Sequence, residues 1–153
     1  MIIFHDKPEK LHGEFCINIF RDGEIVERIE ERNLIVNSGR VRLAELAAGK
    51  SSAYITQIGV GSGSNIENED DTQLEEQQLF PLKTITVEGR DAKFEFELGI
   101  NDANGLSIRE FALFCSDNVM FSHKVRINPD TGKARTIEKE SDIQITGYWI
   151  IHF

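Results

Sequence analysis

The sequence SIREFALFCSDNVMFSHKV, residues 107–125, is the most informative stretch of this protein for its fold. It contains an unbroken apolar run at residues 111–115, then a polar turn at residues 116–118, then a second apolar run. A strand with one face in water alternates apolar and polar side chains, whereas a strand covered on both faces is a continuous apolar run. We therefore expect a hairpin whose first strand is buried on both sides. The cover is either a helix and a second sheet of the same chain, or a neighbouring subunit.

Strand-like alternation continues through much of the chain. In KFEFELG, residues 93–99, the side chains of Phe94, Phe96 and Leu98 share one face. The segment DIQITGYWIIHF, residues 142–153, has the same pattern, and its apolar face carries Ile143, Ile145, Trp149, Ile151 and Phe153. Turn-forming residues predict hairpins at residues 22–23, 88–91, 116–118 and 129–132.

One helix is expected between the strands. The segment NSGRVRLAELAAG, residues 37–49, offers Asn37 or Ser38 as an N-cap and Gly49 as a C-terminal stop. Its apolar stripe is narrow and consists of Leu43, Leu46 and Ala47. A short helix with such a stripe is stable only when it packs on a sheet.

These patterns predict a mainly β protein. We expect an antiparallel β-sandwich-like domain of about eight strands at residues 14–153, with one short α-helix at about residues 38–48 packed on it. Residues 1–13 are expected to form an N-terminal lead or arm. Residues 124–139 are expected to form a basic hairpin within the domain.

The acidic charge is concentrated in one segment. The chain has 17 Lys and Arg against 26 Asp and Glu, a formal net charge of −9, and residues 51–82 contain no basic residue. Phosphate binding rests on clustered Lys and Arg, so we expect no nucleic-acid partner. No apolar run is long enough to span a membrane or to form the core of a signal peptide, so we expect no membrane insertion. Cys16 and Cys115 fit no metal spacing, which favours two buried free thiols and leaves a disulfide as the alternative.

Two charged patches are candidates for contact surfaces. Acidic side chains gather in one loop, and basic side chains gather on both sides of the turn NPDTG at residues 128–132. From these patches we assign to a contact surface Glu69, Asp70, Asp71, Lys124, Arg126, Lys133 and Arg135. Complementary patches set the register of interfaces, so we hypothesise that the basic hairpin meets the acidic loop of an adjacent subunit or an acidic partner. The alternative is that both patches are solvated surface.

The remaining motifs predict no catalytic or metal-binding chemistry. The glycine-rich segment at residues 58–65 is followed by acidic residues and by no Lys before Lys83, so we interpret it as a structural loop. The acidic loop lacks the order of a calcium-binding EF-hand loop, and calcium binding is left as an alternative. Glu110 shares a strand face with Ala112 and Phe114 and needs hydrogen-bond donors if it is buried. We find no histidine, second acid or nucleophile placed near it by sequence, so we expect no enzyme, no cofactor and no metal.

Four segments of the chain have a recognisable order. They are NLIVNSGRVRLAELAAG (33–49), ITQIGVGSGS with DDTQLEEQ (55–77), GLSIREFALFCSDNVMFSHKV (105–125) and IEKESDIQITGYWIIHF (137–153). Together they resemble a widespread group of small tail proteins and tail-fibre N-terminal domains of bacteriophages and prophages. The residues that carry an Arg-Glu-x-x-Leu-Phe hairpin and a Lys-x-x-Asp closing strand are Arg109, Glu110, Leu113, Phe114, Lys139, Asp142 and Trp149.

The resemblance implies a structural component of a virion tail with no catalytic residues. Tail parts are symmetric oligomers, commonly trimers or rings, so the expected partners are other copies of this chain and other tail proteins. We expect an adaptor or fibre-base protein, located in the virion tail and assembled in the bacterial host cytoplasm. Its expected apolar contact residues are Phe114, Phe121, Trp149 and Phe153. The alternative is a receptor- or carbohydrate-binding module for attachment to the host surface, although one Trp and two Tyr offer few aromatic rings for stacking on sugars.

Overall fold

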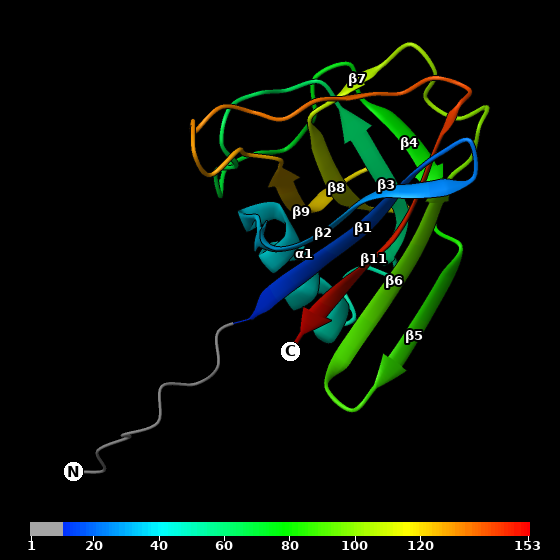
Figure 1. Ribbon diagram of the computed structural model, residues 1–153. Helices are drawn as coiled ribbons and strands as arrows, with labels where there is room; N and C mark the ends of the chain where they lie inside the picture. The colour runs from blue at the N-terminus through cyan, green and yellow to red at the C-terminus, as the bar shows by residue number, and fades with distance from the viewer. Residues whose placement is uncertain (1–10) are drawn as a thin grey trace.

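The computed structural model describes residues 11–153, and in this part of the chain it has eleven strands and one helix (Figure 1). The strands are β1 (His12–Arg21), β2 (Glu24–Ile35), β3 (Ile55–Gly61), β4 (Gln78–Pro81), β5 (Thr84–Glu88), β6 (Asp91–Leu98), β7 (Ser107–Ile108), β8 (Glu110–Cys115), β9 (Met120–Val125), β10 (Ile137–Glu138) and β11 (Ile143–His152). The helix α1 spans Asn37–Ala47. β1 begins at His12, before the predicted start of the domain at residue 14. Residues 1–10 of the predicted lead lie outside the described residues.

Nine of these strands form one antiparallel sheet that curls on itself. Its order is β4-β3-β8-β9-β2-β1-β11-β6-β5, and β7 and β10 form a separate pair. The two edge strands, β4 and β5, are joined by Leu82 and Lys83 alone. The amide of Leu82 donates to the carbonyl of Thr56 in β3 (3.0 Å), and the amide of Lys83 donates to the carbonyl of Glu95 in β6 (2.8 Å). The curl brings the two halves of the sheet face to face, which confirms the prediction of a mainly β, sandwich-like antiparallel fold with one short helix.

Three of the four predicted hairpins are present; the fourth, the basic hairpin predicted at residues 124–139, is not a strand pair. β1 and β2 are joined at Asp22 and Gly23, whose φ angles are 50° and 83°. The turn between β5 and β6 has Gly89 at φ 59°, and the turn between β8 and β9 has Asn118 at φ 63°. The turn at residues 129–132 follows a single bridge between residues 127 and 134 rather than a strand pair.

β8 is buried along its whole length, as its unbroken apolar run predicts. On the inner face, Phe111 joins the main core of the sandwich. The ring of Phe15 in β1 lies 5.0 Å from the ring of Phe111 and 5.1 Å from the ring of Trp149 in β11, measured between centroids. These aromatic contacts join the two halves of the curled sheet at its centre.

The outer face of β8 is covered by other parts of the same chain. Phe114 packs there in a second apolar cluster that also contains Val36, immediately before α1, and Leu74, from the loop between β3 and β4. Phe121 is enclosed in the main core. The prediction that Phe114, Phe121 and Trp149 contact a partner is therefore wrong, because one chain supplies the cover for all three. Phe153 remains partly exposed.

The two cysteines are free and buried, as expected. Cys16 lies in β1 and Cys115 lies at the end of β8, in different parts of the curled sheet. Burial raises the pKa of the Cys115 thiol to about 11, so this group is a poor nucleophile at neutral pH.

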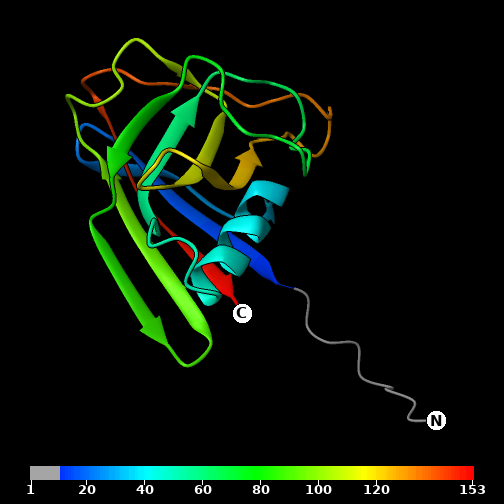
Figure 2. The ribbon, with the colours of Figure 1, turned by 180° about the vertical axis from the view of Figure 1, so that it is seen from behind.

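α1 packs beside β9, and its fully buried residues are small or polar; of its predicted apolar stripe, Leu43 packs against the main core. Leu43 and Leu46 are only half-buried, whereas Gly39 and Arg42 are buried. The N-cap is Val36, so neither of the predicted caps has that role; Ser38 instead donates its hydroxyl to the carbonyl of Met120 in β9 (2.6 Å). Figure 2 shows α1 from the side on which it covers the sheet.

Gly39 is the point of closest approach between α1 and β9. A Cβ atom at this position would collide with the backbone carbonyl of Phe121. We expect Gly39→Ala to lower the free energy of unfolding by about 1–3 kcal/mol, because backbone atoms cannot move aside as a flexible side chain can. Urea unfolding followed by circular dichroism measures this change. Val41→Ala, on the exposed side of the same helix, is the control and should change stability by less than about 0.5 kcal/mol. An equal effect of the two variants would contradict this packing.

Candidate functional site

The acidic loop, residues 66–77, lies against β8 and β9 of its own chain. Lys124 of β9 pairs with Glu31 of β2 (2.8 Å) and lies 3.8 Å from Glu67 of the acidic loop. The same Glu67 accepts a hydrogen bond from the amide of Val125 (3.0 Å). The hypothesis that the basic stretch meets the acidic loop of another subunit is therefore corrected for Lys124, because its acidic partners belong to the same chain.

Two further basic side chains of residues 124–139 also pair with a carboxylate of the same chain. Arg126 is buried and pairs with Glu27 of β2 (3.2 Å), and Arg135 pairs with the same carboxylate (2.7 Å). Lys133, at the turn, is exposed. The prediction of a partner contact is wrong for Arg126, because its side chain is buried and pairs with Glu27 of the same chain. Among the predicted contact residues, the exposed ones are Glu69, Asp70, Lys133, Arg135 and Phe153.

Three ionisable side chains, two of them buried, form a cluster where the acidic loop meets β8 and β9. Nδ1 of His123 lies 2.7 Å from Oδ2 of Asp71, and Nε2 of the same ring lies 2.8 Å from Oε1 of Glu110. Asp71 comes from the acidic loop, His123 from β9 and Glu110 from the start of β8. Asp71 is therefore bound inside its own chain, which corrects its assignment to a contact with a partner.

The second oxygen of Glu110 ties down the glycine-rich loop. Oε2 accepts hydrogen bonds from the amide of Gly63 (2.6 Å) and from the amide of Glu75 (3.0 Å). A Cβ atom at Gly63 would collide with this carboxylate, which explains the glycine. The neighbouring Arg109 points away and donates to the carbonyl of Ser62 (2.8 Å). Arg109 and Glu110 therefore each bind the backbone of the glycine-rich loop, at Ser62 and at Gly63. These contacts agree with a structural role for this loop.

The cluster favours a charged His123. Each ring nitrogen faces a carboxylate oxygen, and an imidazolium can donate to both whereas a neutral ring can donate to only one. Burial, the largest single influence, lowers the pKa of His123, but the hydrogen bonds to Glu110 and Asp71 together outweigh it and the pKa is raised. A cavity of about 110 Å³ lies beside the cluster and is lined in part by Asn65, Ile66 and Gln73.

This arrangement can hold a proton between two carboxylates, and it fastens the acidic loop to the sheet. The expectation that no histidine or second acid lies near Glu110 is wrong. The signal was present in the hairpin: a turn at residues 116–118 sets His123 opposite Ala112, one step along the same face from Glu110. The third member, Asp71, comes from a distant loop and had no comparable signal.

β5 is the least covered strand of the sheet. All of its residues, Thr84–Glu88, are exposed. Ile85 and Val87 lie opposite Phe94 and Ala92 of β6, so they share the inner face of the sheet. Phe94 and Ala92 are 5% and 8% exposed, whereas Ile85 and Val87 are 40% and 75% exposed. The β5–β6 hairpin extends past the rest of the sandwich (Figure 1). The apolar side chains on the inner face of β5 are therefore largely uncovered by the chain.

The comparisons with known proteins add no relative. No protein family, no curated protein and no solved structure matches this chain. Within residues 11–153, no helix has the length and apolar character needed to cross a membrane.

The charged state of His123 predicts a pH dependence of stability. The pKa of His123 is raised by folding, so the charged ring stabilises the folded state. This stabilisation is complete below the unfolded-state pKa of about 6.5 and is lost as the pH rises through the folded-state pKa. As the pH rises from the unfolded-state pKa of His123 through its folded-state pKa, we therefore expect the free energy of unfolding to fall more steeply in the wild type than in His123→Gln. Urea unfolding at a series of pH values measures both slopes.

The comparison with the variant is needed because the pKa of His152 is also raised, its carboxylate partners outweighing the lowering effect of burial. The difference between the two proteins isolates His123, since His152 is present in both. Identical pH slopes would show that His123 carries no stabilising charge.

Proposed function

We propose that this protein is a non-enzymatic structural component that assembles with other copies of itself through the β5 edge. The observation that carries the proposal is the uncovered inner face of β5, described above. On the basis of the sequence resemblance alone, we further propose that the assembly is an adaptor or fibre base in the tail of a phage or phage-derived particle.

An edge strand such as β5 has two unsatisfied surfaces. One is the row of backbone amides and carbonyls that faces away from β6, and the other is the pair of exposed apolar side chains Ile85 and Val87. Natural proteins usually protect such an edge with charges, proline or a covering segment. Added strands satisfy the backbone and can bury the side chains at the same time.

A second copy of β5 fits this edge. If two copies pair in antiparallel register about Thr86, Ile85 of each lies opposite Val87 of the other, and both apolar pairs fall on one face. The two-fold contact is self-complementary, as in most homodimers. A trimer or ring requires a second, different contact, for which the exposed predicted residues on the acidic loop and basic hairpin are available.

The alternative of a carbohydrate-binding module gains no support from the aromatic residues. Trp149 is fully buried in the core, so its ring cannot stack on a sugar. Tyr148 is half-buried, and its ring is already covered by the ammonium group of Lys93 at 4.5 Å from the centroid. Tyr54 is exposed, but among the described residues no other aromatic ring lies beside it to form a stacking platform.

Self-association through β5 is tested by light scattering on the wild type and on Val87→Lys. We expect the wild type to have at least the mass of a dimer, and the variant to be a monomer, because a Lys on the inner face buries a charge in the pair. Val26→Lys is the matched control: it places the same charge at an exposed apolar position of β2 and should leave the mass unchanged. A monomeric wild type, or equal effects of the two variants, would contradict the proposal.

The tail assignment needs a separate experiment. We expect the tagged protein to co-sediment with purified tails when particles are induced from the strain that carries its gene. We also expect no binding on a glycan array. Glycan binding together with absence from the particles would favour the attachment module instead.

A further inference from the structure

The strand register brings three chemistry-bearing residues into one row across the sheet. His12 of β1 is the backbone partner of His152 of β11, and His152 is in turn the partner of Asp91 of β6. Glu14 lies two positions beyond His12 in β1, so its side chain falls on the same face. This is the outer face of the sheet, because Ile151, which precedes His152 in β11, has its side chain in the core on the opposite face.

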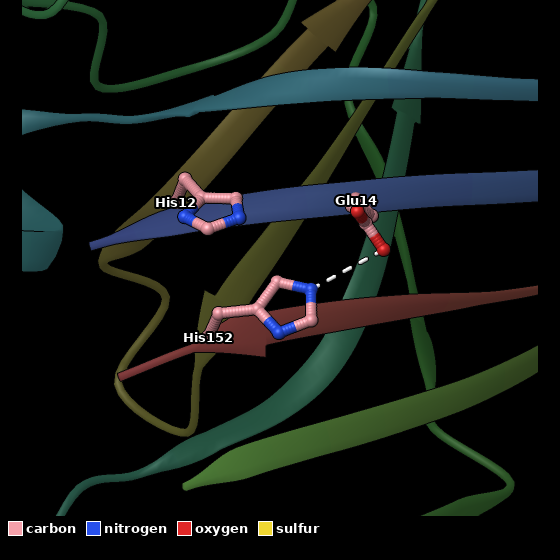
Figure 3. Close-up of side chains that lie close together, drawn as sticks. All are labelled: His12, Glu14 and His152. Atoms are coloured by element: carbon pink, nitrogen blue, oxygen red, sulfur yellow. Dashed lines mark ion pairs between the residues drawn. The ribbon is translucent and has the colours of Figure 1, made fainter. Parts of the chain in front are cut away.

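The side chains of His12, Glu14 and His152 converge (Figure 3). One ligand atom from each lies within 4.8 Å of the others, and this is the one such histidine–carboxylate group found among residues 11–153. The two imidazole rings are stacked with their centroids 4.7 Å apart. Oε2 of Glu14 lies 3.2 Å from Nε2 of His152. Nitrogen and oxygen ligands that surround a zinc ion tetrahedrally are separated by about 3.3 Å, so a small closure would complete the geometry.

A fourth residue, Asp91, orients the ring of His152. Its Oδ1 lies 2.7 Å from Nδ1 of His152, which fixes the ring and leaves Nε2 facing Glu14. That nitrogen is shielded from solvent and makes no hydrogen bond of acceptable geometry with any described residue. A carboxylate behind a histidine whose other nitrogen faces a ligand cluster is the usual second-shell arrangement of zinc-binding histidines.

We propose that His12, Glu14 and His152 bind a divalent transition metal, zinc in particular, with Asp91 as the positioning residue behind His152. Two imidazoles and one carboxylate are a typical ligand set for zinc and an unsuitable one for magnesium or calcium, which prefer oxygen ligands. Three ligands leave a fourth coordination position for water or a further ligand. The ion would join the start of β1 to the end of β11.

The same geometry also fits a metal-free cluster in which a charged His152 lies between Asp91 and Glu14. The two descriptions differ in a measurable way. A metal site needs His12 as a ligand, whereas the metal-free ion cluster does not. Variants of His12 therefore decide between them.

The test is isothermal titration of zinc into the full chain after treatment with a chelator. We expect binding of one zinc ion per chain and a rise in Tm on zinc addition, since an ion that binds only the folded state stabilises it. His12→Gln and His152→Gln should abolish this binding. Asp91→Asn should weaken it by roughly 10–100-fold, as loss of a second-shell carboxylate does elsewhere.

Two controls make the outcome unambiguous. His123→Gln removes a histidine from the cluster under the acidic loop and should leave zinc affinity unchanged. Magnesium should neither bind nor raise Tm. If zinc produces no heat and no change in Tm in the folded wild type, or if binding survives in His12→Gln and His152→Gln, the proposed site does not exist and the residues form an ion cluster only.

Discussion

The buried carboxylate of Glu110 is the group around which the rest of this structure is arranged. A carboxylate inside a sheet is costly unless donors surround it. Here three donors come from two separate segments: the ring of His123 in β9, and the amides of Gly63 and Glu75 in the long connection from β3 to β4. The connection cannot lift away without removing two of these three donors from the buried carboxylate. It therefore stays over the outer face of β8 and brings Leu74 to its place against Phe114.

A polar contact thus determines where the apolar cover lies. β8 is buried on both faces within one chain, so its long hydrophobic run does not report a partner. On the inner face of the sheet, exposed apolar side chains lie instead in the β5–β6 hairpin, at Ile85 and Val87. The charged patches are also partly satisfied within the chain: Lys124, Arg126 and Asp71 are paired internally. The other predicted charged contact residues, Glu69, Asp70, Lys133 and Arg135, are exposed.

Local sequence patterns predicted most of the fold. The cluster around His123 was not predicted, because contacts between residues far apart in the sequence form it. Alternation in residues 93–99 predicted the correct buried face of β6, and turn residues predicted three hairpins correctly but not the one at residues 129–132. The interface assignment of Phe114 failed because a strand that is apolar on both faces looks the same in sequence whether its cover is a loop of the same chain or a neighbour. The pairing of His123 with Asp71 joins residues 52 positions apart, and no periodicity links a loop carboxylate to a strand. Arg42 was missed as a packing residue because its guanidinium is buried by pairing with Asp117 of a distant turn.

The direct passage of the chain from β4 to β5 has a consequence for the size of any assembly. β4 is a short edge of four residues that ends in Pro81, a residue unable to donate to another strand. Among the described strands of the curled sheet, the other edge, β5, is the longer one and carries no proline. A molecule with a single usable edge stops growing after one addition, so strand pairing between copies ends in a closed unit and cannot propagate into an open-ended filament.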